Sequence, residues 1–196
     1  MDTLIIFIKN PKLGKVKTRL AATVGDEKAL YIYKQLLDFT RNLAISLSVK
    51  RMLFYSDKIE TEDNWSPIFF QKNKQQGNDL GERMKNAFHT TLLTSSKAVI
   101  IGSDCAELTK EILENAFEAL EKNDFVLGAA EDGGYYLIGM NYFEPSIFEN
   151  MEWSTDEVFS KTVVKINELN KKATFLPMLS DTDNEEDWKK IKHLLK

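Results

Sequence analysis

The feature that most constrains this chain is a series of short apolar runs, several of which are followed at once by polar or charged residues. Residues 3–8 and residues 98–102 each form such a run, with almost no polar side chain inside it. A strand that is apolar on both faces is typical of a sheet that is covered by helices on both sides. Between these runs lie segments with apolar residues three and four positions apart, which is the pattern of amphipathic helices. The sequence therefore predicts an α/β fold.

The predicted strands and helices alternate along the chain. Strands are expected at residues 3–8, 51–55, 68–71, 98–102, 124–130, 135–140 and 173–178, and helices at 26–47, 79–93, 109–120, 155–170 and 184–195. This alternation predicts a three-layer α/β/α sandwich with a Rossmann-like, mostly parallel sheet. The length of 196 residues suggests one domain, residues 1–196. In such sheets ligands bind at the carboxyl ends of the strands.

Composition narrows the classes of partner. The formal net charge of −4 argues against broad nucleic-acid binding, which needs a basic face. Cys105 is the single cysteine, so no internal disulfide can form and a reducing compartment is expected. No apolar run approaches the roughly 20 residues of a membrane span. We therefore expect a soluble cytoplasmic protein with no membrane partner. A homodimer stays open, because four aromatic side chains are either core or interface: Phe69, Phe70, Phe143 and Phe148.

A basic loop follows the first predicted strand. It carries five cations and one glycine in a chain that is acidic overall: Lys9, Lys12, Gly14, Lys15, Lys17 and Arg19. Such a loop at the end of a buried strand is suited to holding phosphates. It is not the P-loop of NTPases, because Lys9 stands where that motif needs glycine and Val16 where it needs serine or threonine. The alternative is a solvated basic loop with no ligand.

Two acidic clusters follow later predicted strands. Asp104 comes directly after the run at 98–102, where it suits a Mg²⁺ ligand or, equally, a turn cap. Asp181 and Asp183 lie two positions apart, so that in extended chain both carboxylates point the same way. The competing interpretation is a helix cap, since Asp183 with Glu186 fits a capping box. The two roles are compatible.

A fourth cluster joins the predicted strands at 124–130 and 135–140. Its sequence is Glu-Asp-Gly-Gly-Tyr-Tyr, residues 131–136. A plain hairpin explains the glycines, but not the carboxylates before them or the tyrosines after them. Two glycines also let the backbone approach a ligand closely. Outside these clusters we expect Cys105, His89 and His193 to be structural, so a nucleophilic triad is not predicted.

Taken together, the motifs resemble those of one family. They are Lys-x-Pro-x-x-Gly-x-x-Lys-Thr-Arg-Leu (9–20), Gly-x-Asp-Leu-Gly-Glu-Arg-Met (77–84), Ser-Asp-Cys (103–105), Glu-Asp-Gly-Gly-Tyr-Tyr-Leu-Ile-Gly (131–139), Trp-Ser-Thr-Asp (153–156) and Asp-x-Asp-x-x-Glu-Asp (181–187). The chain resembles the DUF2064 family of GT-A-fold, glycosyltransferase-like proteins. That family is similar to 2-phospho-L-lactate guanylyltransferases and molybdenum-cofactor nucleotidyltransferases. Ala106 departs from the family pattern, which usually has proline there.

The resemblance implies a nucleotide bound near the amino-terminal half of a Rossmann-like sheet. The expected catalytic residues are Lys17, Arg19 and Asp104, and the expected ligands of Mg²⁺ or Mn²⁺ are Asp104, Asp181 and Asp183. The expected nucleotide-binding residues are Lys9, Gly14, Lys15, Thr18, Asp79, Asp132, Gly133, Gly134 and Tyr135.

We therefore expect a Mg²⁺-dependent transferase that moves a nucleotidyl group from an NTP to a small phosphorylated acceptor. The dense basic loop favours a triphosphate over a less charged donor. A glycosyltransferase with a nucleotide-sugar donor is the alternative, with sugar contacts from Asp132, Tyr135 and Asp156. A non-catalytic nucleotide-binding protein of the same fold is the second alternative.

Overall fold

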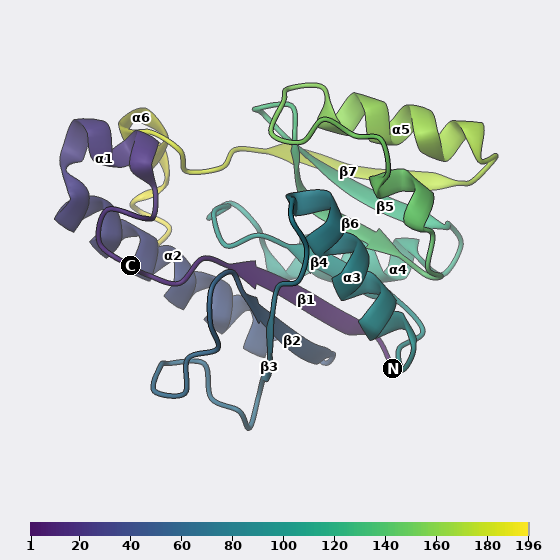
Figure 1. Cartoon of the computed structure of the whole chain (residues 1–196), viewed down its shortest axis with the longest axis horizontal. Coiled ribbons are helices and arrows are strands. Elements are labelled where there is room, and N and C mark those ends of the chain that lie inside the picture. Colours follow the sequence, from purple (N-terminus) through teal and green to yellow (C-terminus); the bar gives the residue numbers. More distant parts are fainter. Residues whose placement is uncertain (196) are drawn as a thin grey trace.

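A computed structural model describes residues 1–195 and contains one seven-stranded sheet (Figure 1). The strand order is β3-β2-β1-β4-β6-β5-β7, and only β6 runs antiparallel to its neighbours. The strands are β1 (Thr3–Ile8), β2 (Lys50–Tyr55), β3 (Gln71–Lys74), β4 (Ala98–Ile101), β5 (Phe125–Ala130), β6 (Tyr135–Met140) and β7 (Ala173–Leu179). The helices are α1 (Thr18–Val24), α2 (Asp26–Ile45), α3 (Leu80–Leu92), α4 (Lys110–Ala119), α5 (Val158–Glu168) and α6 (Glu185–Ile191), with a 3₁₀ turn η1 (Pro145–Phe148).

Helices cover both faces of the sheet, as the doubly apolar strands predict. Alternate residues of β1 enter different cores: Leu4 and Ile6 join the cluster that contains α2 and α4 residues. Ile5 and Phe7 join the cluster that contains residues of α3, η1 and α5. Because every residue of β1 is buried, the strand has no solvent face. The expected three-layer α/β/α sandwich with a mostly parallel sheet is confirmed.

A third, smaller core lies beside the sheet, where α1 and α6 pack against α2 (Figure 1). Its centre is formed by Leu20, Ile32 and Ile191, which are almost fully buried. This core fixes α1 and α6 beside the ends of β1 and β7, where the expected site residues lie. No helix among residues 1–195 combines the length and apolar character needed to cross a bilayer.

Two predicted elements are displaced in the structure. The third strand is β3, at Gln71–Lys74 rather than residues 68–71. Ile68 is 85% exposed in a turn, and Phe70 instead packs edge-on against Trp65 with ring centroids 4.8 Å apart. Of the other phenylalanines considered for an interface, Phe148 is buried, Phe143 packs against the core, and Phe69 is about half exposed.

The last helix also differs from its prediction. It spans Glu185–Ile191 rather than residues 184–195. Its N-cap is Asn184, whose side chain accepts hydrogen bonds from the N–H groups of Glu186 and Asp187, while Asp187 completes the capping box. The competing interpretation, in which Asp183 caps this helix, is therefore wrong by one residue. The shift leaves the Asp183 carboxylate free for other partners.

The sheet brings distant parts of the chain to one edge. The carboxyl ends of β1, β4, β5 and β7 all face the same way because these strands are parallel, and antiparallel β6 begins at that edge. Lys9, Gly102, Glu131 and Ser180 are the first residues beyond those strands. The four clusters singled out in the sequence thus follow or precede strands at a single edge.

Candidate functional site

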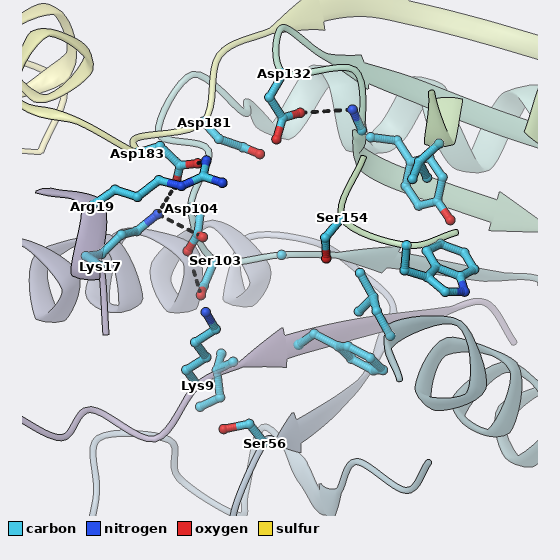
Figure 2. Close-up of a pocket in the computed structure, with 18 of the residues that line it drawn as sticks. Lys9, Lys17, Arg19, Ser56, Ser103, Asp104, Asp132, Ser154, Asp181 and Asp183 are labelled. Atoms are coloured by element: carbon cyan, nitrogen blue, oxygen red, sulfur yellow. Dashed lines mark hydrogen bonds and ion pairs between the residues drawn. The ribbon is translucent and has the colours of Figure 1, made fainter. Parts of the chain in front are cut away.

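A cleft of about 750 Å³ opens at this edge. Figure 2 shows the Lys17–Asp104–Asp183 cluster on one side of it and Ser154 on the other. Most of the residues that line the cleft are polar or charged, and several of the others are aromatic. The lining residues are Phe7, Ile8, Lys9, Lys17, Thr18, Arg19, Tyr33, Ser56, Gln75, Leu80, Arg83, Gly102, Ser103, Asp104, Asp132, Gly134, Tyr135, Trp153, Ser154, Thr155, Asp156, Val158, Asp181 and Asp183.

Lys17 forms the centre of the charged cluster. Its Nζ lies 2.8 Å from Oδ2 of Asp104 and 3.3 Å from Oδ1 of Asp183, and only 5% of its side chain is exposed. Burial lowers the pKa of Lys17, but the charge and hydrogen bond of Asp104, helped by Asp183 and Asp181, outweigh burial and hold the pKa above its ordinary value. The ammonium group is therefore a permanent cation in the cleft.

Lys17 has an unusual backbone conformation. It is the N-cap of α1 and has a φ of +47°, in the left-handed region that side-chain-bearing residues seldom adopt. The first turn of α1 then carries Thr18 and Arg19 into the cleft, and Arg19 Nη1 lies 3.2 Å from Oδ2 of Asp183. Asp183 thus pairs with two of the five cations at positions 9–19, Lys17 and Arg19.

Asp104 and the acidic pair after β7 are held together by the backbone. The N–H of Thr182 donates to the carbonyl of Asp104 at 3.0 Å, which joins the segment after β7 to the segment after β4, although β6 and β5 separate these two strands in the sheet. Thr182 is fully buried, whereas Asp181 and Asp183 both line the cleft. The predicted arrangement of carboxylates two residues apart on the same side is therefore present.

Tyr33 of α2 fixes the ends of β1 and β4. Its hydroxyl donates to the carbonyl of Lys9 (3.0 Å), accepts from the N–H of Lys9 (2.8 Å) and lies 3.3 Å from Oγ of Ser103. Burial, and then the charge of Asp104, raise the pKa of Tyr33, so the hydroxyl stays protonated. Lys9 thereby has a rigid backbone, and its side chain extends along the cleft in Figure 2.

Asp181 is the least compensated acid in the cluster. Within the described part of the chain its carboxylate makes no hydrogen bond or ion pair. Burial raises the pKa of Asp181 to about 7, the charge of Asp104 adds to this, and Lys17 opposes it. The cluster therefore carries an excess of negative charge that an additional cation would relieve.

This excess predicts a pH dependence of the metal-free protein. Asp181 holds its proton up to about pH 7 when folded, but an unfolded aspartate releases it near 3.8. The contribution of this proton to stability is complete below about pH 4 and is lost as the pH rises through about 7. At about 1.4 kcal/mol per pKa unit, unfolding free energy should fall by roughly 2 kcal/mol between pH 5 and pH 7. Urea denaturation in EDTA should show this fall in the wild type. If the unfolding free energy of Asp181→Asn falls by the same amount over this pH range, Asp181 is not the group responsible for the fall.

The opposite wall is formed by the β5–β6 turn and by residues 153–158. Gly133 has a φ of +86°, and a Cβ there would overlap the backbone of Asp156. The N–H of Phe159 donates to the carbonyl of Gly133 at 2.9 Å. The conformational freedom of this glycine therefore locks the turn onto the loop that carries Asp156.

Trp153 is held in a similar way by α3. A Cβ at Gly81 would overlap the indole of Trp153, so the glycine provides the space in which the ring lies. Trp153 also stacks on Phe148, with centroids 6.4 Å apart. Its indole consequently has a fixed position in the cleft wall.

The structure brings together most of the residues expected at the site. Nine of the predicted residues line the cleft together with Lys17, namely Lys9, Thr18, Arg19, Asp104, Asp132, Gly134, Tyr135, Asp181 and Asp183. Gly14, Lys15, Asp79 and Gly133 are not lining residues. Asp79 is instead the N-cap of α3 and accepts from the N–H of Glu82, and Lys12 pairs with Asp57 outside the cleft.

Several residues that line the cleft are not among the site residues expected from the sequence. Arg83 and Trp153 lie inside the motifs at 77–84 and 153–156, so these motifs indicate that both residues belong to the site. Ser56, Gln75 and Tyr33 carried no signal, because their positions depend on tertiary packing. Gln75, for example, donates from its amide to the carbonyls of Ile8 and Phe54.

The acidic residues fit a hard divalent cation, because they offer only oxygen ligands. The uncompensated carboxylate of Asp181 is the structural observation that favours one. Across residues 1–195 no three histidine, cysteine, aspartate or glutamate side chains are grouped closely enough to hold a metal by themselves. Mg²⁺ commonly takes one or two carboxylates together with substrate phosphates. The donor set therefore fits a cation that binds along with a phosphate-bearing ligand.

Comparisons with known proteins relate the chain to one family and to several solved structures. The family model described as "Uncharacterized protein conserved in bacteria (DUF2064)" matches residues 39–155. A crystal structure from Desulfovibrio desulfuricans G20, provisionally named a nucleotide-diphospho-sugar transferase, is 31% identical with a TM-score of 0.87. The match covers 93% of this chain and 82% of that one. No curated protein matches the sequence significantly.

More distant solved structures share the fold alone. A 4-diphosphocytidyl-2C-methyl-D-erythritol synthase from Anaerococcus prevotii is 11% identical, with a TM-score of 0.59 over 100% of this chain and 96% of its own. Rv0371C from Mycobacterium tuberculosis, in complex with manganese, is 9% identical, with a TM-score of 0.56 over 97% of each chain.

Proposed function

The chain belongs to the DUF2064 family, and from that premise and the geometry of its cleft we propose that it is a transferase that acts on a nucleotide donor with the help of a divalent cation. The observation that carries the proposal is the position of Lys17 Nζ, buried between the carboxylates of Asp104 and Asp183 at the carboxyl edge of the sheet. A fixed cation beside acidic groups is what a metal-bound polyphosphate requires.

The cationic residues of the cleft support the proposal that the amino-terminal half of the chain binds the donor phosphates. Lys9, Lys17, Arg19 and Arg83 are the cations of the lining, and all precede residue 84. Three of them belong to the loop after β1 and the first turn of α1. In the proposal these three bind the phosphates, and Asp104 with Asp181 or Asp183 holds Mg²⁺ or Mn²⁺. When bound, the cation would neutralise charge on the phosphates.

Nucleotidyl transfer is the first candidate reaction, because the loop cations suit a departing pyrophosphate. An oxygen of the acceptor forms a bond to the α-phosphorus of an NTP, and the bond to the β-phosphate oxygen breaks. The electron pair leaves with pyrophosphate, whose growing charge Lys17 and Arg19 stabilise. The ammonium of Lys17 suits this role because its raised pKa keeps it charged.

Glycosyl transfer from a nucleotide sugar is the second candidate. Only three of the five loop cations line the cleft, which weakens the preference for a triphosphate. The name of the 31% identical relative, nucleotide-diphospho-sugar transferase, points in the same direction. In this version the leaving group is a nucleoside diphosphate.

A ligand panel tests the shared part of the proposal. Thermal shifts are measured with ATP, GTP, CTP, UTP and nucleotide sugars, each with and without Mg²⁺ or Mn²⁺. A ligand at a hundred times its Kd adds about 2.7 kcal/mol of stability. If no nucleotide shifts the melting temperature at millimolar levels, the proposal is contradicted. Release of pyrophosphate or of nucleoside diphosphate then selects the reaction.

Replacing Asp104 tests the metal. In Asp104→Asn the metal-dependent part of the thermal shift should disappear while the apoprotein stays folded, because an amide is a much poorer ligand of Mg²⁺ than a carboxylate. Asp57→Asn is the matched control, since Asp57 pairs with Lys12 outside the cleft. An unchanged metal response in Asp104→Asn would refute the assignment of this residue.

A further inference from the structure

The ammonium group of Lys17 lies between two carboxylates that are expected to bind a metal ion. Its Nζ is 2.8 Å from Oδ2 of Asp104 and 3.3 Å from Oδ1 of Asp183 (Figure 2). Asp104 follows β4 and Asp183 follows β7, and β6 and β5 separate these strands in the sheet. A single side chain of the protein thus neutralises acids from two separate segments.

Every oxygen of these two carboxylates has a partner within the protein. Oδ1 of Asp104 accepts from the hydroxyl of Ser103 at 3.4 Å, and Oδ2 pairs with Lys17. Oδ1 of Asp183 pairs with Lys17 as well, and Oδ2 pairs with Arg19 at 3.2 Å. A metal ion that binds to either carboxylate must therefore replace a contact that is already made.

Lys17 is the stronger of the two cationic partners. Only 5% of its side chain is exposed, whereas 79% of the Arg19 side chain is exposed. Exposed ion pairs are screened by water and contribute little. A metal ion that shared Oδ2 of Asp104 with the ammonium group would be repelled by its charge at close range. Lys17 is therefore the main obstacle to a metal ion at these carboxylates.

We propose that Lys17 is an internal counter-ion, which keeps a divalent cation from Asp104 and Asp183 until the phosphates of a donor draw its ammonium group away. This role rests on the proposed transfer from a nucleotide donor. Phosphate oxygens offer the ammonium group a charged partner in place of the carboxylates, so the exchange leaves it paired. The released carboxylates and the phosphates then bind the cation together.

The conformation of Lys17 suits such an exchange, because its backbone is held and its side chain is flexible. Its carbonyl accepts from the N–H of Ala21 at 2.8 Å, as the first hydrogen bond of α1. The ammonium group lies at the end of a flexible four-carbon chain and has three rotatable donors. It changes partners while α1 stays in place. The same movement brings the cation to the phosphates, where the proposed function requires it.

The exchange makes the binding of the cation and the donor cooperative. The donor removes Lys17 from the carboxylates, so it raises their affinity for the cation. By linkage, the cation raises the affinity for the donor by the same factor. In a protein without this ammonium group the carboxylates are free from the start, and the cooperativity should be smaller.

Mn²⁺ binding to the full chain without a nucleotide tests the blocking step. Free Mn²⁺ is measured by EPR during titration of the wild type, Lys17→Met and Lys15→Met. We expect Lys17→Met to bind Mn²⁺ at least about tenfold more tightly than the wild type, because no charged hydrogen bond has to be broken. Lys15→Met removes the same charge outside the cleft lining and should stay within about twofold of the wild type. No gain in Lys17→Met, or an equal gain in Lys15→Met, would overturn the proposal.

A crystal structure of the wild type checks this step without a substitution. In crystals grown with millimolar MnCl₂ and no nucleotide, we expect Lys17 to keep its contacts and the space between Asp104 and Asp183 to show no anomalous peak. Mn²⁺ bound between these two carboxylates in the absence of a nucleotide would contradict the proposal.

The release step is tested by the cooperativity of Mn²⁺ with ADP, GDP, CDP or UDP, measured by tryptophan fluorescence. For the tightest of these four, Mn²⁺ should raise the affinity about tenfold more in the wild type than in Lys17→Met. Equal cooperativity in the two proteins would overturn the release step. Failure of all four to bind the wild type contradicts the proposed function, and the nucleotide-free Mn²⁺ titration still decides whether Lys17 is the counter-ion.

Discussion

Lys17→Met should lower kcat/KM for the nucleotide donor by a factor of about 10²–10³, because it removes a cation positioned for the departing phosphates. It also leaves Asp104 and Asp183 facing the donor without the ammonium that lies between them. Since more than a third of each carboxylate side chain is exposed, water screens much of the lost ion pair, and we expect a stability loss of only about 1 kcal/mol. Steady-state kinetics and urea denaturation measure the two effects.

Lys15→Met is the matched control for this variant. Lys15 belongs to the same loop and is exposed, but it does not line the cleft. Its replacement removes the same charge from the chain and should leave kcat/KM within about twofold at physiological ionic strength. Equal losses in the two variants would mean that the loop acts through its net charge and not through the position of Lys17.

Gly133→Ala should destabilise the protein by about 2–4 kcal/mol. The positive φ costs roughly 1–2 kcal/mol for a residue with a Cβ, and the overlap with the backbone of Asp156 costs a similar amount. Because the overlap lies between the turn and the loop at 153–158, amide hydrogen exchange in that loop should also accelerate. Urea denaturation and hydrogen-exchange mass spectrometry measure these effects.

Gly134→Ala provides the comparison at the neighbouring position. Gly134 has no positive φ, and its added Cβ would lie 3.2 Å from Oδ1 of Asp132, which is the end of a side chain and not backbone. Its cost should therefore stay below about 1 kcal/mol. If the two alanine variants lose the same stability, the turn is not locked to the loop by Gly133.

Much of the site could be predicted because it depends on strand ends. Lys9 and Asp104 each follow a short apolar run, and parallel strands bring such positions to one edge. The two-residue spacing of Asp181 and Asp183 predicts that their side chains point the same way, because alternate residues of an extended chain face the same side. These features follow from periodicity and connectivity, which the sequence contains directly.

The remainder depended on contacts between distant segments. The local pattern around Ile68 and Phe69 favours a strand, yet β3 begins at Gln71, where the chain pairs with β2. Lys12 turns away from the cleft because Asp57, in the loop after β2, pairs with it. Trp153 has its place because Gly81, more than seventy residues earlier, lacks a side chain. None of these pairings has a signal in one sequence.

The central claim is that donor phosphates bind between the loop cations and the acids at the carboxyl edge of the sheet. The most direct test is a crystal structure with Mn²⁺ and the most stabilising nucleotide, with Mn²⁺ located by its anomalous scattering. We predict a single strong peak at the carboxylate of Asp104, with phosphate oxygens between the metal and Lys17. A nucleotide bound elsewhere, or Mn²⁺ located away from Asp104, Asp181 and Asp183, would contradict the claim.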